Sequence, residues 1–97
     1  MSRVIHTGQA LVDATATVPG LPPRGQNVMA DGWNQAAGGA VNILAAAARS
    51  GAECVHAGTI GTGPNGDLVR STLAAEGVAW TAPTVDDRDT AMCVVLV

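Results

Sequence analysis

Two adjacent glycines followed by an asparagine form the clearest ligand-binding pattern in the 97-residue sequence. Gly38 and Gly39 stand directly before an alanine-rich segment, and Asn42 lies one turn into it. Glycines at a helix start leave backbone N–H groups uncovered, and the helix dipole adds partial positive charge there. Asn42 supplies both a donor and an acceptor, which suits the hydroxyl groups of a polyol. The alternative is a plain glycine turn followed by a solvent-facing asparagine.

Asp13 adds an acidic side chain at the end of the first extended segment. Ligands of parallel α/β sheets bind at the carboxyl ends of the strands. Gly8, Asp13 and Gly61 all fall at such ends in the expected arrangement. We therefore expect Asp13 and Asn42 to converge on one polyol. Trp33 either stacks on that ligand or serves packing or a dimer contact.

A second glycine-rich turn, residues 61–66, reads GTGPNG and matches the GxGxxG pattern of dinucleotide-binding folds. Asp86 follows about where such a fold places its ribose-binding acid. Two prolines oppose this interpretation, because Pro64 lies inside the turn and Pro83 lies in the expected next strand. Dinucleotide binding is therefore kept only as an alternative.

The remaining reactive side chains favour structural roles. His6 and His56 each stand two residues before a glycine, which allows them to be neighbours on adjacent parallel strands, but two histidines make a poor metal site. Cys54 and Cys93 lie in apolar runs, which predicts two buried thiols and a reducing, cytoplasmic location. The charged run 86–89 predicts a solvated turn.

Composition excludes several classes of partner. The net charge is −3 and no Lys/Arg cluster is present, which argues against nucleic acid and anionic membrane surfaces. No apolar run reaches the roughly 18 residues of a membrane-spanning helix, and no signal peptide is recognised. A small-molecule ligand fits better. The size and the 47% apolar content indicate one domain or a piece of one.

The candidate residues depend on alternating strands and helices for their positions. The pattern predicts strands at 3–11 and 54–60, a helix at 40–49, and a second helix at 66–76 with Asn65 as its cap. Two prolines predict exposed strands joined by a rigid turn over residues 13–36. Residues 78–97 predict either a hairpin or two separate extended segments. This alternation predicts an α/β fold with a helix-covered parallel sheet.

The order and spacing of the sequence motifs resemble those of the ribokinase-like, or PfkB-type, carbohydrate kinases. The matching motifs span the chain: GxxxxD at residues 8–13, a Pro-rich turn, GGxxN at 38–42, AAAARSGAE, IGTGPNG, AAEGV, and Thr90-Ala91. The resemblance implies a three-layer α/β sheet with flanking helices and a small β lid, of which residues 1–97 form the N-terminal part. The lid strands would lie near 13–36 and 78–97.

The resemblance also implies that Asp13, Gly38, Gly39 and Asn42 hold the sugar. Leu11 stands where ribokinases proper carry a polar residue, so the identity of the sugar is open. Gly63 stands where the family usually has an aspartate in the second turn.

The activity implied is ATP-dependent phosphorylation of a sugar hydroxyl. The family's DTxGAGD-like segment, which supplies the catalytic base and the phosphate anion hole, is missing from this sequence. ATP and Mg²⁺ would therefore be bound mainly by residues outside it, no catalytic residue is assigned within it, and the 97 residues alone are expected to be inactive. Two alternatives are a nucleoside kinase of the same fold and a non-catalytic sugar-binding or dimerisation module built on the lid strands. The exposed edges of these strands also suggest a homodimer.

Overall fold

The computed structural model describes residues 2–97 as a mixed α/β structure, as the sequence predicts. Its elements in chain order are β1 (Arg3–His6), β2 (Ala10–Thr17), β3 (Gly32–Gly39), α1 (Ala40–Arg49), β4 (Glu53–His56), β5 (Ile60–Gly61), α2 (Pro64–Ala75), β6 (Ala79–Trp80), β7 (Thr84–Val85) and β8 (Met92–Leu96).

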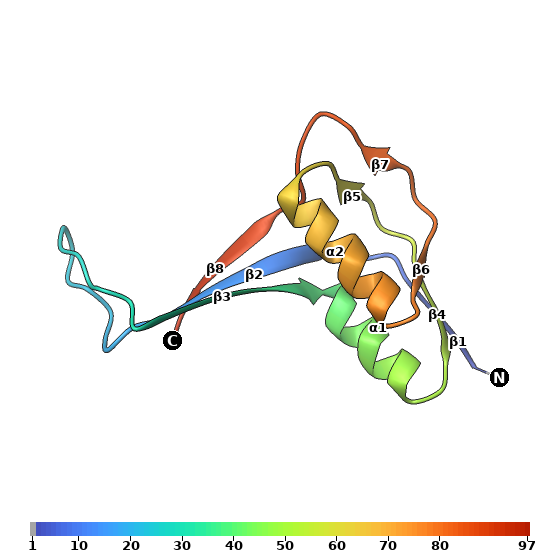
Figure 1. Ribbon diagram of the computed structural model, residues 1–97, viewed down its shortest axis with the longest axis horizontal. Coiled ribbons are helices and arrows are strands. Elements are labelled where there is room, and N and C mark those ends of the chain that lie inside the picture. The colour runs from blue at the N-terminus through green and yellow to red at the C-terminus, as the bar shows by residue number, and fades with distance from the viewer. Residues whose placement is uncertain (1) are drawn as a thin grey trace.

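The main sheet contains the parallel strands β1, β4 and β6 in the order β1-β4-β6. Helices α1 and α2 lie side by side next to this sheet (Figure 1). Their buried side chains, including Leu44 of α1 and Val69 and Leu73 of α2, share one core with Cys54 of β4. Burying such apolar surface supplies most of the stabilisation of a small fold.

A second sheet has the order β3-β2-β8, and we call it the lid sheet, or lid, after the expected lid strands. Of the expected lid region 78–97 only β8 belongs to it, because β6 pairs with β4 and β7 pairs with β5. Strand β2 runs antiparallel to β3 and parallel to β8. The two strands β2 and β3 continue into a long loop at the far end of the molecule from the helices (Figure 1). Every second residue of β2 is buried, from Ala10 to Ala16, so Leu11, Asp13 and Thr15 share the opposite face.

Local signals place the helices well. Helix α1 has the bounds that the alanine-rich segment predicts. Helix α2 ends before Gly77, whose φ of 71° is the left-handed conformation in which glycine terminates helices.

Residues 3–11 do not form the single strand that the sequence predicts. The chain leaves β1 after His6, and the Gly8 N–H donates to His6 Nδ1 at 3.0 Å, so the strand stops and β2 begins at Ala10 in a different sheet. Residues 54–60 are likewise divided between β4 and β5. Both breaks occur at glycines, where the chain changes sheets.

One of the two cysteines was predicted wrongly. Cys54 is buried as expected, whereas Cys93 is exposed on β8. The apolar run that contains Cys93 is an edge strand, and four of its five residues are exposed. An apolar run in the sequence does not show whether a helix or another sheet packs over it, so it does not by itself predict burial.

Candidate functional site

Asp13 and Asn42 converge over Gly38. Because Gly38 pairs with Leu11 and Ala36 with Asp13 across β2 and β3, the aspartate lies diagonally beside the glycine on one face of the lid. A Cβ atom on Gly38 would overlap Asp13 Oδ2, and it would stand 3.0 Å from Asp13 Cγ and 3.6 Å from Asn42 Nδ2. The missing side chain thus leaves room for a carboxylate and an amide at one place.

Gly39 makes the sharp turn from β3 into α1. Its φ of 64° is unfavourable for residues with a side chain, and a Cβ atom there would lie 2.6 Å from the Gln9 carbonyl oxygen. The next N–H, of Ala40, donates to the same oxygen at 3.0 Å. Gly39 therefore lets the helix start pack directly against the connection between β1 and β2.

The N-terminus of α1 is open beside these residues. Gly39 is the N-cap, and within residues 2–97 no side chain caps this helix and no acidic residue lies in its first turn. Uncapped N–H groups together with the helix dipole attract oxygen atoms of a ligand. The four residues Asp13, Gly38, Gly39 and Asn42 are thus brought together, while their binding of a ligand stays a prediction.

Strand β8 adds a side chain that the sequence interpretation missed. Cys93 pairs with Asp13 in parallel register, so both side chains stand on the same face of the lid. Trp33 pairs with Ala16 and therefore belongs to the other face. This register does not support stacking of Trp33 on a ligand held by Asp13. No local sequence pattern could have shown which face of the lid Trp33 occupies, because that depends on the pairing of β3 with β2.

The second glycine-rich turn is closed by an internal carboxylate. Asp89 Oδ2 accepts a hydrogen bond from the Asn65 N–H at 3.0 Å, and Asp89 Oδ1 accepts one from the Gly66 N–H at 2.9 Å. These are the N–H groups that a dinucleotide pyrophosphate would need. The turn at residues 61–66 is therefore a structural feature here, which removes the basis for the dinucleotide alternative.

Two predictions about this region were wrong. Asn65 lies inside α2, whose N-cap is Gly63, and its side-chain amide donates to the Thr90 carbonyl at 3.1 Å. The run 86–89 is not wholly solvated, because Asp89 is partly buried and holds α2. Burial raises the pKa of Asp89, but hydrogen bonds from Gly66, Asn65 and Thr90, with the charge of Arg70, outweigh burial and lower the pKa below its ordinary 3.8.

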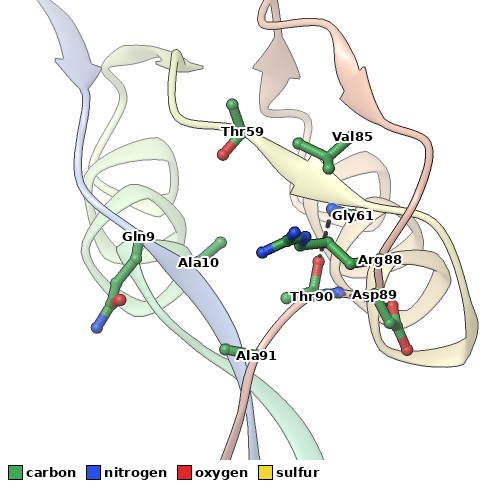
Figure 2. Close-up of a pocket in the computed structure, with 9 residues that line it drawn as sticks. All are labelled: Gln9, Ala10, Thr59, Gly61, Val85, Arg88, Asp89, Thr90 and Ala91. Carbon is green, nitrogen blue, oxygen red and sulfur yellow. Dashed lines mark hydrogen bonds between the residues drawn. The ribbon is translucent and has the colours of Figure 1, made fainter.

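A small cavity of about 180 Å³ lies between the end of β1, the β5 region and the segment leading to β8. Figure 2 shows Arg88 extending between Thr59 and Thr90, with Gln9 and Ala10 across the cavity. None of Asp13, Gly38, Gly39 or Asn42 lines it. The cavity is therefore separate from the polar cluster over Gly38.

The two histidines are neighbours, as the sequence predicts, because His6 and His56 pair in the parallel register of β1 and β4. Glycines make room for both rings: Cβ atoms on Gly8 and Gly58 would lie 2.6 and 2.9 Å from the respective imidazole Cε1 atoms. His56 is completely buried with both ring nitrogens unpaired. Burial lowers its pKa, and repulsion from His6 lowers it further. Within residues 2–97 no group of three or more potential metal ligands occurs.

Comparison with known proteins assigns the family. The model of the pfkB family of carbohydrate kinases matches residues 1–97, and the chain therefore belongs to this family. A ribokinase from Cryptococcus neoformans var. grubii serotype A, solved with ADP, is 27% identical with a TM-score of 0.84 over 98% of this chain. A fructokinase from Xylella fastidiosa, solved with ATP, is 28% identical with a TM-score of 0.77 over 99% of it. An aminoimidazole riboside kinase from Salmonella enterica is 26% identical with a TM-score of 0.73 over 97% of it.

These matches confirm the ribokinase-like fold that the sequence motifs imply. The chain spans 30%, 30% and 29% of the three solved proteins, respectively. A search of curated proteins found no match. No helix within the described residues is long and apolar enough to cross a membrane.

Proposed function

We propose that residues 1–97 are the substrate-binding, N-terminal part of an ATP-dependent sugar kinase. The observation that carries the proposal is the convergence of the Asp13 carboxylate and the Asn42 amide over Gly38, beside the uncapped start of α1. Carbohydrate kinase family membership supports the reaction class. The ADP and ATP named with two of the solved relatives support a nucleotide as the phosphoryl donor.

The residues of this chain would bind and orient the sugar. The Asp13 carboxylate accepts hydrogen bonds from sugar hydroxyls, and Asn42 both donates and accepts. Apart from the Ala40 N–H, which donates to Gln9, the peptide N–H groups of the first turn of α1 have no side-chain cap, and Gly38 and Gly39 carry no side chains that would obstruct a sugar there. Holding the acceptor hydroxyl in line with the transferred phosphoryl group is a large part of catalysis in such reactions.

The phosphate-binding groups and the base are proposed to lie in polypeptide outside these 97 residues. The family's Mg²⁺ would neutralise phosphate charge when bound. No cluster suited to a metal ion occurs among residues 2–97, so we assign this chain no part in holding it.

The test replaces Asp13 in the full-length kinase by asparagine and by alanine, and it compares both with Asp31→Asn, which removes an exposed carboxylate from the long loop. We expect KM for the preferred sugar to rise about 10- to 100-fold in the Asp13 variants, since a hydrogen bond to a charged group is lost. The Asp31 variant should match the parent. An unchanged KM and kcat after Asp13→Ala would remove Asp13 from the site.

A nucleoside acceptor is the second candidate, because one solved relative is a riboside kinase. A coupled ADP-release assay on sugars and nucleosides in parallel separates the two, since the preferred class is the one with the higher kcat/KM.

The sequence-based expectation of a homodimer through the lid strands stays a prediction. It is supported by the exposed apolar side chains of the edge strand β8, such as Val94 and Leu96. Native mass spectrometry of the full-length kinase distinguishes a dimer from a monomer.

A further inference from the structure

The segment that enters β8 is fastened to helix α2 by one carboxylate. Asp89 accepts hydrogen bonds from the backbone N–H groups of Asn65 and Gly66 at 3.0 and 2.9 Å. It also accepts the Thr90 N–H at 2.7 Å. Asp89 lies 24 residues after Asn65 in the sequence, so this helix cap joins two distant parts of the chain.

Gly63 provides the room for this cap. It is the N-cap residue of α2 and makes no side-chain cap of its own. A Cβ atom on Gly63 would lie 2.6 Å from Asp89 Cγ, and its φ of 145° disfavours other residues. The family usually has an aspartate at the position of Gly63. In this chain the carboxylate at the start of α2 is supplied by Asp89 instead.

Further hydrogen bonds extend the connection toward the lid. The Thr90 hydroxyl is buried and accepts the Gly61 N–H at 2.8 Å (Figure 2). The Asn65 amide donates to the Thr90 carbonyl at 3.1 Å. One residue later, the Ala91 carbonyl accepts the Val12 N–H at 3.0 Å, directly before Asp13 in β2. The position at which β8 joins β2 is thus set within two residues of Asp89.

We propose that Asp89 is a positioning residue for the sugar site, because it fixes the start of β8 on α2 and thereby fixes the lid face that carries Asp13. This inference rests on the proposed function. Asp89 acts through the backbone of α2 and β8, since its carboxylate is occupied by three N–H donors. The sugar would not contact it.

The test compares Asp89→Ala and Asp89→Asn in the full-length kinase, with Asp86→Ala as the matched control from the same charged run. We expect Asp89→Ala to raise KM for the sugar about 3- to 30-fold, the factor that corresponds to loss of a helix cap, while KM for ATP changes less than about twofold. Asparagine keeps one carbonyl oxygen, which can still accept the Gly66 and Thr90 N–H groups, but its NH₂ group cannot accept the Asn65 N–H, so Asp89→Asn should raise KM less than Asp89→Ala does. Asp86→Ala should leave every constant unchanged.

Amide hydrogen exchange of the free enzyme supplies a readout that needs no substrate. We expect faster exchange at Gly61, Gly66 and Val12 in Asp89→Ala, and protection close to that of the parent in Asp89→Asn. The inference is overturned if Asp89→Ala keeps the parental sugar KM, or if alanine and asparagine impair sugar binding equally. If the parent phosphorylates no sugar, the proposed function fails, and exchange still reports whether Asp89 holds β8.

Discussion

Replacing Gly38 by alanine tests the site with a single methyl group. The φ of Gly38 is not positive, so the backbone accepts alanine without strain. The new methyl would overlap Asp13 Oδ2 and lie 3.0 Å from Cγ, so the carboxylate must turn away, moving its oxygen on the order of 1 Å. If a charge-assisted hydrogen bond to the sugar is lost, about 1.5–3 kcal/mol of binding goes with it. The sugar dissociation constant should then rise about 10- to 150-fold.

Calorimetric titration of the sugar into the full-length kinase measures this change, with Gly20→Ala as the control. Gly20 has no atom within 4 Å of its would-be Cβ and no positive φ, so alanine there should bind sugar like the parent. Thermal unfolding of both variants checks that the fold is kept. Parental affinity in Gly38→Ala would refute the argument, because it would show that the carboxylate over Gly38 does not contact the sugar.

Three further outcomes are expected. A maleimide should modify the exposed Cys93 but not the buried Cys54. Sugar should slow the reaction at Cys93, because that side chain shares a face with Asp13. Peptide mapping by mass spectrometry measures both rates, and an unchanged rate at Cys93 with sugar present would contradict the prediction. Burial lowers the pKa of His56, so the unfolded chain binds its proton more readily, and the free energy of unfolding should fall as pH drops below 6.5. His56→Leu should flatten this dependence in urea titrations at a series of pH values, and an unaltered slope would show that another group is responsible. The pKa of Asp89 is lowered, so its stabilising contribution is present above pH 3.8 and is lost as pH falls below it; acid unfolding of Asp89→Asn should therefore be less steep than that of the parent.

Signals carried by neighbouring residues were sufficient for helix α1 and for the existence of α2, although not for the cap of α2. The position of Asp13 was not predicted in this way, because it lies within β2 rather than at the end of the first strand and faces Gly38 only through the pairing of β2 with β3. The glycine pair, the alanines that follow and the Ser50-Gly51 stop predict α1 with its observed bounds, because helix formation depends on residues within one or two turns. Asn42 must then lie in the first turn of that helix. The motif order also indicated the carbohydrate kinase family, which the family match confirms.

Features that depend on distant pairing could not be predicted in this way. Residues 3–11 read as one strand, yet they are divided between two sheets, since His6 pairs with His56 while Ala10 and Leu11 pair with Gly39 and Gly38. The apolar run around Cys93 gave no sign that it would form an exposed edge.

Asp89 shows most clearly the difference between what local sequence signals predict and what long-range contacts decide. In the sequence it belongs to a charged run that is typical of a solvated turn, and in the fold it caps a helix that begins well before it in the chain. Residue types and their spacing determined which helices form and which polar groups stand ready at their ends. Tertiary packing alone decided which carboxylate meets which N–H group, because hydrogen-bond partners far apart in sequence are selected by how the layers come together.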